Sequence, residues 1–197
     1  MKFGSVLNGV EDASLAGFGL KTVIHDRKLK RNSGDIKVQY RANLQTFNYR
    51  GINPETGNIA EAGRFASYLI SLYCVLKRVP QSRADSEYRG FWTRARAVLM
   101  AKEKEYAKGG NRYHNFHEAI EINEQLEGEV TQKSQVVLGM AMKHIVSVQD
   151  LIAQLGDDLD KPRTKDEVDR INYLLDEKFG DLVNYVVLLT GFLLETE

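Results

Sequence analysis

The chain has 197 residues, with 27 basic and 27 acidic side chains and a single cysteine. This length suits one well-buried domain and is short for two. The balanced charge argues against a protein that mainly coats nucleic acid, and one cysteine cannot form an intrachain disulfide. No stretch reaches the roughly 20 apolar residues of a membrane-spanning helix, so we expect a cytoplasmic protein without a membrane partner.

Residues 1–57 are predicted to form an N-terminal extension. Short alternating apolar pieces at residues 22–24 and 36–40 flank the turn-like sequence R-N-S-G-D at residues 31–35. This pattern predicts a small β-hairpin. The basic run at residues 27–31 then forms a solvated hairpin tip, with contact to phosphate or RNA as the alternative.

Residues 58–197 are predicted to form a helical domain, because apolar side chains there recur every three and four residues. Thr164 and Glu167 have the spacing of a capping box, which marks the start of the last helix. Four or five long helices predict a mainly α bundle. The predicted helices cover residues 59–76, from 85 or 86 to about 107, 134–155, and from 164 almost to the end.

Residues 111–121, N-R-Y-H-N-F-H-E-A-I-E, concentrate titratable groups beside aromatic rings. One interpretation is the edge of a binding site. The other is a helix start whose charges face solvent while Tyr113 and Phe116 pack inward. If this stretch is helical, four potential metal ligands lie one turn apart: His114, His117, Glu118 and Glu121.

Two carboxylates on the last predicted helix, Glu177 and Asp181, are four residues apart and project side by side. Such a pair can share Mg²⁺, which prefers oxygen ligands and retains waters that a phosphate can displace. Asp150 on the preceding helix could complete the site, and Lys143 would then neutralise phosphate. Both carboxylates also lie opposite the apolar stripe of their helix, so simple exposure to solvent is the alternative.

Three longer motifs connect these residues to a known group of proteins. They are K-E-Y-A-K-G-G-N-R-Y-H-N-F at residues 104–116, M-K-H-I-V-S-V-Q-D at 142–150, and D-E-K-F-G-D-L-V-N-Y-V-V-L-L at 176–189. Together they resemble a family of small phage-encoded, nucleotide-modification-associated proteins. That family is similar in turn to the all-α nucleoside-triphosphate pyrophosphatases of the MazG type, and the resemblance covers about residues 100–190.

The resemblance implies a nucleotide site with magnesium. In the pyrophosphatases, an E-x-x-E pair and an E-x-x-D pair on neighbouring helices hold the metal at the triphosphate, and water cleaves between the α- and β-phosphates. Asp181 matches the aspartate of the second pair, whereas Lys178 stands in place of its glutamate. Where the first pair is expected, the chain has Lys143, Ser147 and Asp150.

The leading hypothesis is a phage-type nucleotide-binding protein, active as a magnesium-dependent nucleoside-triphosphate pyrophosphohydrolase. In this form Glu177, Asp181 and Asp150 are the catalytic and metal-binding residues. The residues assigned to the substrate are Arg112, His114 and Lys143 on the phosphates, Tyr113 on the base, and Asn115.

Two other functions stay open from the sequence. One is a non-catalytic phage factor in the host cytoplasm that sequesters a nucleotide or binds a host protein. The other is an interaction module that uses the apolar helix at residues 59–76. A homodimer is expected from the same resemblance, because bundles of that superfamily place the nucleotide site near a subunit contact.

Overall fold

A computed structural model of the chain describes residues 3–17, 32–52, 59–106, 110–128 and 133–196. Within these ranges every regular element is a helix and no strand occurs, which confirms the mainly α class. The described helices number seven, so the predicted count of four or five is too low. They are α1 (Phe3–Gly17), α2 (Ser33–Arg50), α3 (Ile59–Leu76), α4 (Ala84–Tyr106), α5 (His114–Glu127), α6 (Lys133–Leu155) and α7 (Lys165–Thr196), with 3₁₀ turns at Gln81–Arg83 and Gly156–Asp158.

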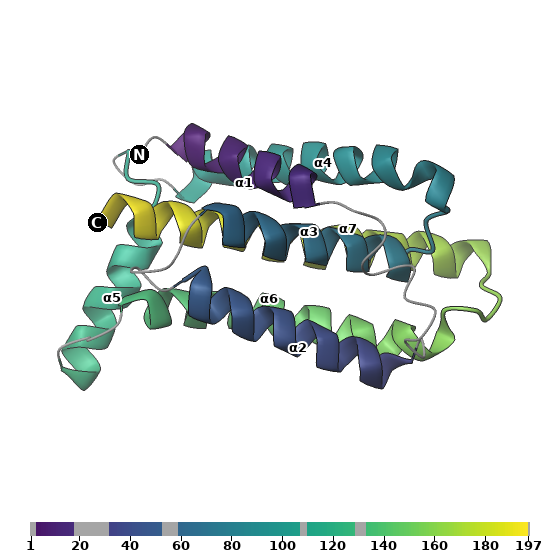
Figure 1. Ribbon diagram of the computed structural model, residues 1–197. Helices are drawn as coiled ribbons and strands as arrows, with labels where there is room; N and C mark the ends of the chain where they lie inside the picture. The colour runs from purple at the N-terminus through teal and green to yellow at the C-terminus, as the bar shows by residue number, and fades with distance from the viewer. Residues whose placement is uncertain (1–2, 18–31, 53–58, 107–109, 129–132, 197) are drawn as a thin grey trace.

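Six of these helices form an elongated bundle, and α5 leaves it at one end (Figure 1). In this view α1 and α4 lie along the top, α3 and α7 along the middle, and α2 and α6 along the bottom. The middle helices make contacts in both directions, since α3 packs on α1, α2, α4 and α7 while α7 also packs on α1, α4 and α6. Both termini lie at the end where α5 turns away.

The predicted helix at residues 59–76 is confirmed as α3, and 13 of its 18 residues are buried. Its nearly continuous apolar surface is therefore accounted for by its central position in the bundle. By length and composition alone, α3 and the segment Lys133–Asp158 would both be long and apolar enough to cross a membrane, a test that core helices of soluble proteins also pass.

The last helix begins at the predicted capping box. The Thr164 backbone N–H donates to Glu167 Oε2 at 2.7 Å, and the Glu167 N–H donates to Thr164 Oγ1 at 3.3 Å. These two bonds satisfy amides that the first turn of a helix leaves without backbone partners. The capping box therefore fixes the start of α7.

The predicted β-hairpin is wrong where the structure describes it. Residues 36–40 lie within α2, and residues 22–24 fall outside the described residues. The Asn32 side chain accepts a hydrogen bond from the Asp35 N–H at 2.9 Å, so the sequence that resembled a turn is a helix N-cap. Tyr40 then anchors α2, because its buried hydroxyl donates to the carbonyl of Ile145 on α6 at 3.0 Å.

The helix α1 has no counterpart among the predicted elements. It packs on α3 and α7, so part of the predicted N-terminal extension belongs to the core. Its closest approach is at Gly63 of α3, where a Cβ atom would overlap Ala13 and the backbone of Ser14. Glycine is needed there because the two helix backbones nearly touch.

Two predicted boundaries also shift. Neither Asp85 nor Ser86 caps α4, which begins at Ala84 as a continuation of the 3₁₀ turn Gln81–Arg83. The helix α5 runs on to Glu127. The mostly polar residues 124–127 are therefore helical.

A cluster of charged groups joins α3, α4 and α7 at their half-buried junction. Glu87 Oε1 on α4 accepts hydrogen bonds from Tyr73 at 2.7 Å, Lys77 at 2.9 Å and Arg94 at 2.7 Å. Asp176 on α7 lies 2.6 Å from the Tyr73 hydroxyl and 3.1 Å from Arg94. Tyr73 has one hydroxyl proton, so it donates to one of the two carboxylates at a time.

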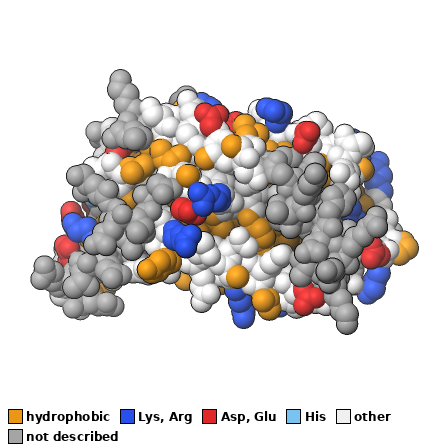
Figure 2. Space-filling model, viewed as in Figure 1, with side chains coloured by type: hydrophobic (Ala, Val, Ile, Leu, Met, Phe, Trp, Pro, Cys, Tyr) orange, Lys and Arg blue, Asp and Glu red, His pale blue; other side chains and the backbone are white. Residues whose placement is uncertain are grey.

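The described surface carries charges of both signs. On the face drawn in Figure 2, basic and acidic side chains are interspersed between separate hydrophobic patches. This agrees with the zero net charge of the chain. The overall charge therefore does not distinguish one face of the protein as a binding surface.

Candidate functional site

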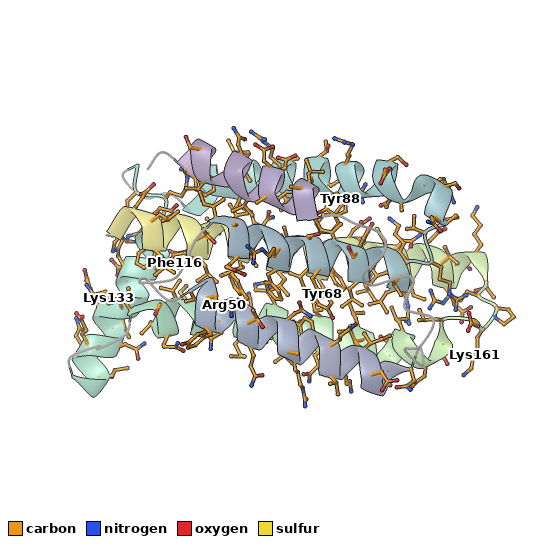
Figure 3. All side chains as sticks on the ribbon, viewed as in Figure 1. Arg50, Tyr68, Tyr88, Phe116, Lys133 and Lys161 are labelled. Carbon is orange, nitrogen blue, oxygen red and sulfur yellow. The ribbon has the colours of Figure 1, made fainter. Side chains whose placement is uncertain are left out.

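The candidate site is a cavity of about 320 Å³ at the end of the bundle where α5 begins. Five helices and the turn before α5 contribute to its wall. Phe116, labelled in Figure 3, marks the place where α5 joins the bundle. The lining residues are Phe3, Leu99, Lys102, Arg112, Tyr113, Asn115, Phe116, Met140, Lys143, His144, Asp181, Asn184, Tyr185 and Leu188.

Helical spacing explains why these side chains meet. The α7 residues follow intervals of three and four, as do those of α6, and the two α4 residues are three apart. Side chains at these intervals share one face of a helix. Helices α4, α6 and α7 therefore each direct a row of polar and apolar side chains into the same cavity.

The turn before α5 supplies the fourth side of the cavity. Gly110 has a φ of +83°, a conformation that favours glycine, and the Tyr113 N–H donates to Asn111 Oδ1 at 3.0 Å. The Tyr113 ring then crosses α7 at Gly191, where a Cβ atom would overlap its hydroxyl. Gly191 therefore allows the start of α5 to sit directly against α7.

The wall beside α5 is aromatic. The Tyr113 ring stacks on Phe116 with centroids 6.0 Å apart and meets Phe192 edge-on at 5.7 Å. The ring centroid of Phe116 lies 6.4 Å from that of Tyr185, and the ring centroid of Tyr185 lies 4.7 Å from that of His144. A planar aromatic ligand would find both faces and edges of rings along this wall.

The charged end of the cavity centres on Asp181. Its carboxylate lies 3.0 Å from Lys102 Nζ and 3.5 Å from His144 Nδ1. Burial lowers the pKa of His144 below 6.5, with Lys143, Lys102 and Lys178 adding to the effect and Asp181 opposing it. Burial therefore favours the uncharged form of this histidine.

The cavity carries a net positive charge. Among the described residues that line it, Lys102, Arg112 and Lys143 are basic and only Asp181 is a carboxylate. Arg112 is held by the ring of Phe3, whose centroid lies 4.0 Å from the guanidinium carbon. This balance favours an anionic ligand.

One buried amide in the cavity has no partner. Asn184 is 5% exposed, and neither its Nδ2 nor its Oδ1 has a hydrogen-bond partner. Buried polar groups are nearly always paired, so an unpaired amide on a cavity wall indicates a place where a ligand or water binds. The Tyr113 hydroxyl, which lies against Gly191, is likewise buried without a partner.

The structure brings five of the predicted site residues to this cavity: Arg112, Tyr113, Asn115, Lys143 and Asp181. They come from separate segments of the chain that pack at one end of the bundle. Their proposed roles toward a nucleotide stay predictions.

Three other predicted residues do not line the cavity. His114 points to Glu118 on its own helix, with Nδ1 and Oε1 3.6 Å apart. Glu177 pairs with its neighbour Lys178 at 2.7 Å. Asp150 is exposed on α6, six residues or about 9 Å along the helix from His144.

The residues present do not fit the predicted three-carboxylate magnesium site. Of Glu177, Asp181 and Asp150, only Asp181 lines the cavity, and its carboxylate is already paired with Lys102 at 3.0 Å. In the part of the chain that the structure describes, no three histidine, cysteine, aspartate or glutamate side chains gather closely enough to hold a metal. This applies also to the predicted histidine and glutamate set on α5, where His117 packs on the ring of Phe192 at 5.3 Å.

Sequence reasoning missed several lining residues, most importantly Lys102, and it placed Asn184 only in line with Glu177 and Asp181, opposite the apolar stripe, without a role. Lys102 follows Leu99 by three residues on a predicted helix, which places it at the edge of an apolar face. Asn184 follows Asp181 by the same interval. His144, the histidine of the second motif, also lines the cavity, and its Nδ1 lies 3.5 Å from Asp181 Oδ2.

No protein-family model, no curated protein and no solved structure matches this chain. The resemblance to the phage family and to the pyrophosphatases therefore stays a prediction from the three motifs.

Proposed function

We propose that this protein binds a nucleotide in the cavity at the start of α5. The observation that carries the proposal is the convergence of three basic side chains and a row of aromatic rings on one cavity. A nucleotide combines an anionic phosphate with a flat, stacking base. A nucleotide therefore matches both the basic side chains and the aromatic wall of the cavity.

The phosphate contacts are assigned to Lys102, Lys143 and Arg112. Lys143 is exposed at the mouth, and Lys102 is partly exposed, so both ammonium groups can reach a ligand that enters from solvent. An incoming phosphate would compete with Asp181 for Lys102. Charge-assisted hydrogen bonds of this kind are stronger than neutral ones.

The size of the cavity supports a single nucleotide. Small-molecule sites typically enclose roughly 300 to 1,000 Å³, and this cavity of about 320 Å³ is at the lower end. It can enclose one base with part of its sugar phosphate. A dinucleotide would extend well outside it.

Binding without hydrolysis is the form of this function that the described carboxylates favour. Magnesium-dependent pyrophosphate release, as in the MazG-type enzymes, is the alternative, and it needs more oxygen ligands than Asp181 supplies. A panel of nucleoside triphosphates with Mg²⁺ separates the two forms. We expect thermal stabilisation without pyrophosphate release, and release with any of them would identify an enzyme.

The binding test compares two lysines on α6. Ligand at 100 times its Kd stabilises a protein by about 2.7 kcal/mol, which a thermal shift assay detects. Lys143→Gln should weaken nucleotide binding about tenfold and reduce its dependence on salt, whereas Lys133→Gln, an exposed lysine outside the cavity, should not. Equal affinities of the two variants would contradict the phosphate assignment, and no stabilisation of the unaltered protein by any nucleotide would refute the proposal.

The proposal includes a homodimer in the host cytoplasm. Its support is the exposed apolar edge of α5, where Ile122 is 52% and Leu126 is 79% exposed on a helix that leaves the bundle. A second copy that covered this edge would bury apolar area close to the cavity. Analytical sedimentation of the unaltered protein and of Leu126→Glu tests the dimer. The unaltered protein should sediment as a dimer and the variant as a monomer. A monomer in both samples would contradict the dimer and leave binding of a host protein as the alternative use of this edge.

A further inference from the structure

The buried amide of Asn184 narrows the chemical class of the ligand. Asn184 lies on α7 between Asp181, at the charged end of the cavity, and Leu188, at the apolar end. Both atoms of its amide are buried and without a partner. The side chain therefore presents one donor group and one acceptor side by side to the cavity.

A phosphate group cannot satisfy this amide. Phosphate oxygens accept hydrogen bonds and would satisfy Nδ2, but their negative charge would oppose the lone pairs of Oδ1. The ligand group at Asn184 must offer a donor and an acceptor together. The base-pairing edge of a nucleobase does so, and an asparagine amide can bind that edge with two parallel hydrogen bonds.

The neighbours of Asn184 favour a flat ring over a sugar. Tyr185 follows it in sequence, and the Tyr185 ring connects His144 on one side with Phe116 on the other. Ribose hydroxyls also donate and accept, but a ribose has no flat π face to stack on aromatic rings. Asp181, with Lys102 beside it, lies one turn away, about 4.5 Å along the helix.

We propose that Asn184 recognises the hydrogen-bonding edge of a nucleobase, so the cavity selects nucleotides by their base and not only by their phosphate. The base lies against Tyr185 and Phe116 with its edge on Asn184. Its phosphate extends toward the lysines. This inference rests on the proposed nucleotide binding and adds to it the group that reads the base.

The experiment measures affinities by calorimetry for three kinds of probe. They are the four common nucleoside monophosphates, the same nucleotides methylated on the ring nitrogen of the base-pairing edge, and two ligands without a base, ribose 5-phosphate and inorganic triphosphate. For the unaltered protein we expect one or two monophosphates to bind best. Edge methylation and loss of the base should each weaken binding at least about tenfold, because one or two hydrogen bonds are lost.

Asn184→Leu provides the second measurement, since leucine has a similar size and no hydrogen-bonding groups. This variant should lose about tenfold in affinity for the preferred nucleotide and keep its affinity for inorganic triphosphate within about twofold. The matched control is Asn43→Leu on α2, whose amide donates to the Gln39 carbonyl and does not line the cavity. If Asn184 had a purely structural role, Asn184→Leu would not change the ratio of the affinity for the preferred nucleotide to the affinity for inorganic triphosphate.

The outcomes separate the two proposals. Unchanged nucleotide affinity in Asn184→Leu, tight binding of the methylated nucleotides, or equal binding of ribose 5-phosphate would overturn the base-reading role and leave nucleotide binding intact. If the variant does not fold, the methylated nucleotides decide the question on the unaltered protein. Binding of no nucleotide at all would remove both proposals.

Discussion

The charged junction of α3, α4 and α7 leads to a quantitative prediction for Glu87→Gln. Glutamine keeps the shape of the side chain and an oxygen that accepts hydrogen bonds, but it removes the negative charge. Burial alone would raise the pKa of Glu87, yet the hydrogen bonds from Lys77, Tyr73 and Arg94 lower it from 4.5 to about 2. The folded protein therefore stabilises the charged form of this carboxylate.

The size of the effect follows from the pKa. A lowering from 4.5 to about 2 corresponds to about 3 kcal/mol of folding free energy at pH 7. The Glu87 side chain is 23% exposed, so solvent screening reduces this value. We expect Glu87→Gln to lower the free energy of unfolding by about 2 kcal/mol at pH 7.

The stability lost in Glu87→Gln should depend on pH. A carboxylate with a lowered pKa stabilises the folded state above its unfolded value of 4.5, and this contribution disappears as the pH falls toward 2. Urea titrations compare the free energy of unfolding of the unaltered protein with that of Glu87→Gln. At pH 3 the difference between them should be about half of its value at pH 7, or less. Equal differences at both pH values would refute the electrostatic account, as would an equal loss in Glu124→Gln, an exposed carboxylate on α5.

Three further changes test other parts of the structure. Because burial lowers the pKa of His144 below 6.5, the free energy of unfolding should fall as the pH drops through the folded value, and His144→Gln should flatten that part of a urea-derived pH profile. Gly191→Ala should displace Tyr113, costing about 1 to 3 kcal/mol in thermal unfolding and weakening nucleotide binding; an unchanged melting temperature would contradict the close contact. Thr164→Ala removes the cap of α7 and should cost about 1 kcal/mol, whereas Thr164→Ser should retain most of it in the same assay.

The long helices could be predicted from the sequence because their signals are long or chemically specific. The apolar period over residues 59–76 extends across five turns, so accidental agreement with a helix is improbable. For α7, the Thr164 and Glu167 pair adds a stereochemical reason for the helix to start at that point. Both predictions agree with the structure nearly to the residue.

The N-terminal third was not predictable by the same reasoning. Residues 36–40 are too few to separate a period of two from a period of 3.6, and the adjacent S-G-D resembled a turn. The decisive signal was Asn32 with Asp35 three residues on, which forms the N-cap of α2. In α1, apolar residues at positions 3, 6, 7 and 10 carry helical spacing that the prediction did not use.

The site was predicted in part because the chemistry of its residues is visible while their surroundings are not. Periodicity assigned one inward stripe to α7 and left Asp181 and Asn184 opposite it, toward solvent. The structure packs α7 against α1, α3, α4 and α6, so both side chains lie inside, with Asp181 19% and Asn184 5% exposed. A single sequence shows how apolar a face is, and it does not show how many neighbours surround a helix.

The uninterrupted course of α7 limits how this protein can change by insertion or deletion. One extra residue between Asp176 and Asp181 would turn the rest of the helix by about 100°. The part of α7 up to Asp176, which pairs with Arg94, would keep its orientation, while Asn184 and Tyr185 would rotate out of the cavity. Variation of length should therefore be tolerated in the loop before Thr164, and α7 itself should accept substitutions only.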